Sequence, residues 1–147
     1  MTIDQLFQLS NLGVLPFWLL LIFVPRLPWA VRIVRSPFIA IVPALIYVVL
    51  IVPLVIQLGP SLFRAFGSVN GVMQLLASPT GTTVAWAHLL TFDLLIGRWA
   101  YLDALERGIS SLAMAPVLVF IVMLGPLGFV FYLIARVVHR PRRKISS

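Results

Sequence analysis

The sequence predicts an all-α fold, an integral membrane bundle of four transmembrane helices that forms a single membrane domain over residues 1–147. Composition is the first reason: 61% of the residues are hydrophobic and 10% are charged, whereas a soluble domain is roughly half apolar and about a quarter charged. The second reason is that the apolar residues come in long uninterrupted runs. A soluble chain of this length has too little interior to bury them, so lipid is the expected solvent.

Four apolar segments are long enough to cross a bilayer core of roughly 30 Å, which takes about 20 helical residues. They are residues 5–24, 37–58, 82–102 and 112–135. The second and the fourth carry no charged side chain, whereas polar residues interrupt the first and the third. Three connecting segments are expected outside the spans: a loop over 25–37, an interfacial loop or short helix over 59–81, and a basic tail over 136–147.

Proline and glycine mark where these helices should bend or end. Pro16 lies inside the first span and predicts a kink there. Gly108 follows the third span and predicts its C-terminal stop. The sequence Gly125-Pro126-Leu127-Gly128 lies near the middle of the fourth span and predicts a bend or a local unwinding.

The charges indicate a membrane protein rather than a nucleic-acid-binding protein. Eleven basic and four acidic residues give a net charge of +7, and many of the basic side chains flank apolar runs or lie in the tail. Membrane proteins keep cations there, against lipid headgroups, so membrane lipids are the expected partners. The N-terminus lacks the basic start of a secretory signal and the character of a transit peptide, which favours a retained first span and a bacterial origin.

Three ionisable side chains inside the third span are the candidate catalytic residues: His88, Asp93 and Arg98. Such groups are costly at membrane depth unless they are paired or hydrated. His88 has two alternatives, a hydrogen bond to another helix or ligation of a tetrapyrrole or metal. Asp93 is either a neutral buried acid or a proton-transfer group, and Arg98 either snorkels to the headgroups or orients a ligand.

The same helix supplies the candidate ligand-binding residues. At roughly 100° per residue Gly97 shares a face with Asp93, and its small size would let a helix or a flat ligand approach closely. Asp103 and Arg107 are spaced i,i+4 and predict an ion pair. The full candidate set is Trp86, Gly97, Trp99, Tyr101, Asp103 and Arg107.

Several other chemistries lack their residues. The chain has no cysteine, two histidines and four acidic residues, which argues against disulfides, thiol nucleophiles and a dedicated redox metal site. No metal ligands are therefore assigned. Any catalysis would have to be acid–base work on an apolar substrate.

The third span and the residues after it resemble the signature of the abscisic-acid-deficient-four-like family, which includes neoxanthin synthase-like membrane proteins. Further segments of the chain carry the same resemblance. The matching segments are His88 to Asp103, Glu106 to Ile109, Leu15 to Trp18, Ala115-Pro116 and Leu124 to Gly128.

The resemblance implies a four-span protein of plastids and oxygenic phototrophic bacteria, in a thylakoid or inner membrane. It implies carotenoid (xanthophyll) chemistry of the kind that forms allenic neoxanthin from violaxanthin, an epoxide-opening isomerisation without net redox change and without a required cofactor. His88 and Asp93 would be the acid/base candidates, either of which could move the proton, and Arg98 the orienting group, supported by Asp103 and Arg107.

One alternative stays open beside the carotenoid isomerase: a non-catalytic subunit that binds carotenoid or chlorophyll and associates with a photosynthetic membrane complex. His88 would then be an axial ligand. A small transporter is less favoured, because no inverted repeat is visible, although the Gly/Pro-broken fourth span is compatible with one.

Overall fold

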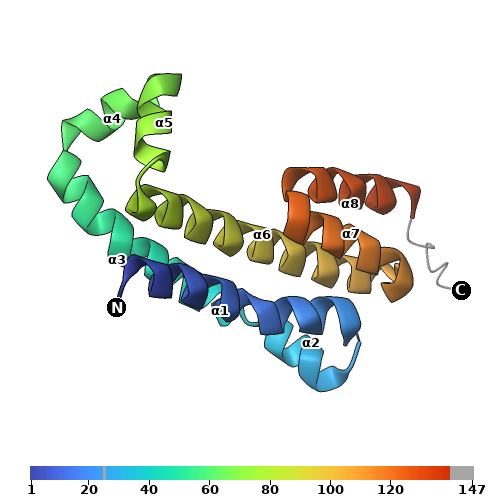
Figure 1. The fold of residues 1–147 in the computed structure, drawn as a ribbon. Helices are drawn as coiled ribbons and strands as arrows, with labels where there is room; N and C mark the ends of the chain where they lie inside the picture. The colour runs from blue at the N-terminus through green and yellow to red at the C-terminus, as the bar shows by residue number, and fades with distance from the viewer. Residues whose placement is uncertain (25, 140–147) are drawn as a thin grey trace, which may run out of the picture. The chain divides into compact units, whose positions relative to one another are not determined.

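The all-α prediction is confirmed by the computed structural model, which describes residues 1–24 and 26–139. Eight α-helices and one 3₁₀ helix make up the described part of the chain (Figure 1). The helices are α1 (Ile3–Phe23), α2 (Pro28–Arg35), η1 (Pro37–Ala40), α3 (Ile41–Leu58), α4 (Pro60–Phe66), α5 (Val69–Leu76), α6 (Pro79–Arg107), α7 (Ser111–Leu124) and α8 (Pro126–Val138). Most of the predicted basic tail, residues 140–147, lies outside the described residues.

Within residues 1–24 and 26–139, two helices, not four, are long and apolar enough to cross a membrane by length and composition: Ile3–Phe23 and Pro37–Leu58. The other two predicted spans need correction. Residues 82–102 are helical within α6, but polar and charged side chains interrupt their apolar run. Residues 112–135 form two helices of 14 and 13 residues, each shorter than the about 20 residues that a crossing takes.

The break in the last apolar segment lies where glycine and proline predicted a bend. Gly125 has a φ of 21°, a backbone conformation that side chains disfavour. Pro126 then starts α8, because it lacks the N–H that would continue α7 and its ring pre-sets a helical φ. The chain therefore turns instead of bending, and α7 and α8 lie side by side (Figure 1).

Two compact units are distinguished by their internal contacts. Unit 1 comprises Met1–Leu15 and Ala40–Phe92, and unit 2 comprises Pro16–Ile39 and Asp93–Ser147. The helices α1 and α6 each contribute one end to either unit. The expectation of a single membrane domain stays a prediction.

Unit 1 is built around a small aliphatic core from α3 and α6, with Ile46, Leu50, Val84 and Ala87 buried in it. The segment 59–81, predicted as a loop with one short helix, contains both α4 and α5 and the start of α6. A proline starts α4 and the Ser68 side chain caps α5, which explains why two helices form in so short a segment.

Unit 2 contains α2 where a loop was predicted over 25–37. The prolines that suggested a loop instead mark helix starts, since Pro28 occupies the first turn of α2. Its apolar Ala30 and Val34 are buried while its arginines are exposed. The predicted stop at Gly108 is confirmed: φ is 72° there, and the N–H groups of Gly108 and Ile109 bond back to the last turn of α6.

Candidate functional site

Segments that carry the family resemblance meet in unit 2 on one face of α6. The Trp18 ring lies against Gly97, where an added Cβ would come 2.5 Å from the Trp18 Cη2 atom. The Asp93 carboxyl lies against Gly125, where an added Cβ would come 2.5 Å from Asp93 Oδ1. Asp93 and Gly97 are one helical turn apart. The two glycines therefore leave room for an indole ring and a carboxyl beside the same stretch of α6.

Trp18 is 4% exposed, and no acceptor within residues 1–24 and 26–139 pairs with its indole N–H. Trp18 is not among the residues predicted for the site, which all come from the third span and the residues that directly follow it. Its place in the Leu15 to Trp18 segment was the available signal. Leaving a buried donor unpaired costs roughly 1–3 kcal/mol of folding stability. The N–H also places a polar group among apolar side chains.

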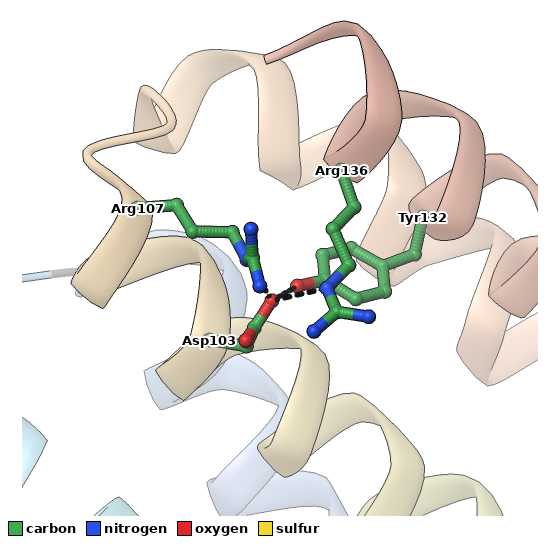
Figure 2. Close-up of polar contacts among 4 residues, drawn as sticks. All are labelled: Asp103, Arg107, Tyr132 and Arg136. Atoms are coloured by element: carbon green, nitrogen blue, oxygen red, sulfur yellow. Dashed lines mark hydrogen bonds and ion pairs between the residues drawn. The ribbon is translucent and has the colours of Figure 1, made fainter. Parts of the chain in front are cut away.

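Asp103, near the C-terminal end of α6, accepts hydrogen bonds from three side chains (Figure 2). The Nε of Arg107 donates over 2.6 Å and the Nε of Arg136 over 3.1 Å to the same carboxylate oxygen, Oδ2. The Tyr132 hydroxyl donates to that oxygen as well. The predicted pair of Asp103 and Arg107 is confirmed, and α8 adds two partners that the sequence analysis missed. We call these four residues the Asp103 cluster.

Electrostatics holds the Asp103 carboxylate in its charged form. Burial raises its pKa, but the hydrogen bonds from Arg107 and Tyr132 and the charges of Arg107 and Arg136 outweigh this and lower the pKa below the usual value. Trp99, a predicted ligand-binding residue, packs against the cluster instead: its ring is 5.3 Å from that of Tyr132 and 5.6 Å from the Arg136 guanidinium carbon.

Arg98 does not point to a free ligand site in this structure, since its guanidinium binds the end of α2. Nε donates to the Val34 carbonyl over 2.7 Å, and a second nitrogen donates to the Arg35 carbonyl. These carbonyls are among the last of a helix, which have no partner inside it. A cation is also favourable at a helix C-terminus.

Arg98→Gln is expected to lower the free energy of unfolding by about 1–2 kcal/mol, because two charge-assisted hydrogen bonds to α2 are lost. Amide exchange in α2 should become faster, because its last carbonyls lose these partners. The control is Arg32→Gln, at an exposed arginine of α2. It should change neither the free energy of unfolding nor the amide exchange in α2. Unchanged stability together with unchanged exchange in α2 would show that Arg98 does not hold α2 in place.

Tyr101 is buried and binds the segment between α1 and α2, where Arg26 in turn contacts the segment after α6. Its hydroxyl accepts a hydrogen bond from the backbone N–H of Arg26 over 3.1 Å, and the Arg26 guanidinium donates to the Ile109 carbonyl over 2.9 Å. Arg26 has a φ of 75°, so these contacts hold a backbone conformation that is uncommon outside glycine. Tyr101 thus has a structural role, because it holds the backbone between α1 and α2.

His88 and Trp86 belong to unit 1. The Trp86 indole N–H donates to the Asn11 amide oxygen over 2.9 Å, and the Trp86 ring stacks on Phe7 with centroids 5.8 Å apart. The His88 ring is tilted against Phe92 at 4.7 Å and Tyr47 at 5.5 Å. His88 borders an apolar cavity of about 250 Å³.

Seven of the nine predicted site residues fall into three groups, while Arg98 and Tyr101 bind the backbone of α2 and of the segment before it. Asp93 lies against Gly125, and Gly97 lies against the ring of Trp18. Asp103, Arg107 and Trp99 gather around Tyr132 and Arg136, and His88 and Trp86 lie among aromatic side chains of unit 1. Tyr132 and Arg136 are themselves spaced i,i+4, a pattern in the sequence that could have been matched to Asp103.

Comparison with known proteins agrees with the motif segments. A family model described as ABA DEFICIENT 4-like matches residues 5–132. The chain is similar to the protein ABA DEFICIENT 4, chloroplastic, of Arabidopsis thaliana, with 27% identity over 115 residues. The match covers 74% of this chain and 51% of the Arabidopsis protein, so the chain spans about half the length of this relative. No solved structure matches.

Proposed function

The chain belongs to the ABA DEFICIENT 4-like family, and we propose that it is a carotenoid-modifying membrane protein that isomerises an epoxy-xanthophyll to an allenic product. The proposal places it in a thylakoid or inner membrane of an oxygenic phototroph. The observation that carries it is the meeting of the motif segments at Asp93, where the Asp93 carboxyl lies against Gly125 and the Trp18 ring against Gly97.

In this proposal Asp93 moves the proton. The neutral carboxylic acid donates its proton to the epoxide oxygen as the C–O bond breaks. A proton then leaves the polyene carbon to the Asp93 carboxylate, the C–H electron pair forms the new double bond of the allene, and the acid is restored. Atoms and electrons balance without an oxidant or reductant, so the step is general acid–base catalysis. Arg98 would act by holding α2 and α6 together, and the Asp103 cluster by fixing α8 to α6.

Asp93→Asn is expected to abolish conversion, because an amide can neither donate nor accept that proton at a useful rate. General acid–base groups contribute typically about 10²–10⁴-fold in rate. The test expresses the variants in cells that accumulate violaxanthin and separates the pigments by chromatography. Asp4→Asn is the matched control, since Asp4 is exposed in the first turn of α1, and it should convert normally. Unaltered pigments with the wild-type chain, or normal conversion by Asp93→Asn, would refute the proposal.

A second candidate function is favoured by the environment of His88, which borders an apolar cavity. In this alternative the chain is a non-catalytic subunit that holds carotenoid or chlorophyll within a photosynthetic complex. It predicts that the chain migrates with a larger pigmented complex in mild detergent. It also predicts that His88→Ala loses bound pigment while the carotenoid profile of the cell stays unchanged.

A further inference from the structure

The apolar cavity of unit 1 has a composition that narrows the choice of ligand. Side chains of α3, α4, α5 and α6 line it, and almost all of them are aliphatic or aromatic. Its volume is about 250 Å³, whereas pockets that enclose a whole drug-sized ligand span roughly 300–1,000 Å³. The cavity therefore fits one end of a long apolar molecule rather than all of it.

Two polar groups interrupt the apolar wall. Tyr47 of α3 and His88 of α6 both line the cavity, with ring centroids 5.5 Å apart. Among the described residues, the side-chain hydrogen bonds include none to the Tyr47 hydroxyl or to the His88 imidazole. A phenol and an imidazole can each donate and accept a hydrogen bond, so together they suit a ligand end that carries a hydroxyl group.

We propose that this cavity, which we call the His88 cavity, binds the hydroxylated ring at one end of a xanthophyll. The ligand class rests on the proposed function, but the site is new and belongs to unit 1, whereas Asp93 belongs to unit 2. The ring and its methyl groups fill the apolar wall, and the hydroxyl bonds to Tyr47 and His88. A lipid acyl chain ends in a methyl group and would leave both polar groups unused.

The first experiment compares zeaxanthin, which has a hydroxyl on each ring, with the hydrocarbon β-carotene. Binding to the purified full chain in detergent is followed by the absorbance of retained pigment. We expect zeaxanthin to bind about tenfold more tightly, the effect of one or two net hydrogen bonds. A double variant, Tyr47→Phe with His88→Phe, should bind both pigments equally. Equal binding of the two pigments by the wild-type chain, or no binding of either, would overturn the inference.

The second experiment fills the cavity. Ala85 lines it, and Ala85→Phe should weaken zeaxanthin binding more than tenfold. Leu89→Phe is the matched control, because Leu89 lies one turn further along α6, is 51% exposed and is not among the lining residues. If zeaxanthin binds Ala85→Phe as it binds the wild type, or if oleic acid displaces zeaxanthin as readily as unlabelled zeaxanthin does, the site does not recognise a xanthophyll ring.

The two proposals fail separately. Zeaxanthin binding that depends on Ala85, Tyr47 and His88, without conversion of violaxanthin in cells, would leave the cavity assignment standing and remove the catalytic proposal. Conversion of violaxanthin in cells, together with normal zeaxanthin binding by Ala85→Phe, would leave the catalytic proposal standing and remove the cavity assignment. The double variant keeps its aromatic rings, so it also tests the site if Ala85→Phe fails to fold.

Discussion

Asp103→Ala is expected to lower the free energy of unfolding by about 2–3 kcal/mol. Three donors lose their common acceptor, and two of them are arginines that would keep an unpaired charge. Breaking a fully buried pair costs roughly 3–5 kcal/mol, but the Asp103 side chain is 16% and that of Arg136 37% exposed, so water reduces the loss. Denaturant titration in mixed micelles measures the effect. The matched control is Glu106→Gln, an exposed acidic residue of the same helix, which should stay within about 0.5 kcal/mol of the wild type.

The pH dependence of the Asp103 cluster has a definite sign. Because folding lowers the pKa of Asp103, the carboxylate contributes stability that is fully present above its unfolded pKa of about 3.9. That contribution is lost as the pH falls through the folded pKa. Asp103→Asn should therefore remove part of the acid-induced loss of stability, a loss that Glu106→Gln should retain. Identical acid titrations of wild type and Asp103→Asn would show that the cluster does not hold α8.

Gly128→Ala is expected to lower the free energy of unfolding by more than about 3 kcal/mol. An added Cβ would overlap the backbone nitrogen of Ile121 and the carbonyl carbon of Phe120, on the facing helix α7. Overpacking against side chains typically costs about 1–3 kcal/mol, and backbone atoms yield less. Alanine is better than glycine in a helix by about 1 kcal/mol, which is too little to offset the overlap.

Gly67→Ala is the matched control for the crossing of α7 and α8. Gly67 lies after α4 with a φ of −76°, and its nearest neighbour to an added Cβ is the Arg64 carbonyl oxygen at 3.2 Å. The free energy of unfolding of Gly67→Ala should differ from that of the wild type by less than about 1 kcal/mol. If Gly128→Ala is as stable as Gly67→Ala, then α7 and α8 do not cross at this glycine.

Local features of the chain were predictable from the sequence because they depend on neighbouring residues. The apolar runs of residues 5–24 and 37–58 predicted two spanning helices, and the structure confirms Ile3–Phe23 and Pro37–Leu58 as candidate spans. Gly108 predicted the end of α6, and the i,i+4 spacing predicted the pair of Asp103 and Arg107. Each of these follows from backbone sterics, helix periodicity or hydropathy within a few residues.

The sequence by itself thus determined the helical class, the two long apolar helices and the identity of the polar residues on α6. Only the tertiary structure decided which partners they have. Tyr132 and Arg136 are 29 and 33 positions from Asp103, and Arg98 meets carbonyls of α2 more than 60 positions away. Helical periodicity gives the face on which a side chain lies, but not the helix that packs against that face. The turn at Gly125 and Pro126 decides this for α8, because it folds the last apolar segment back on itself.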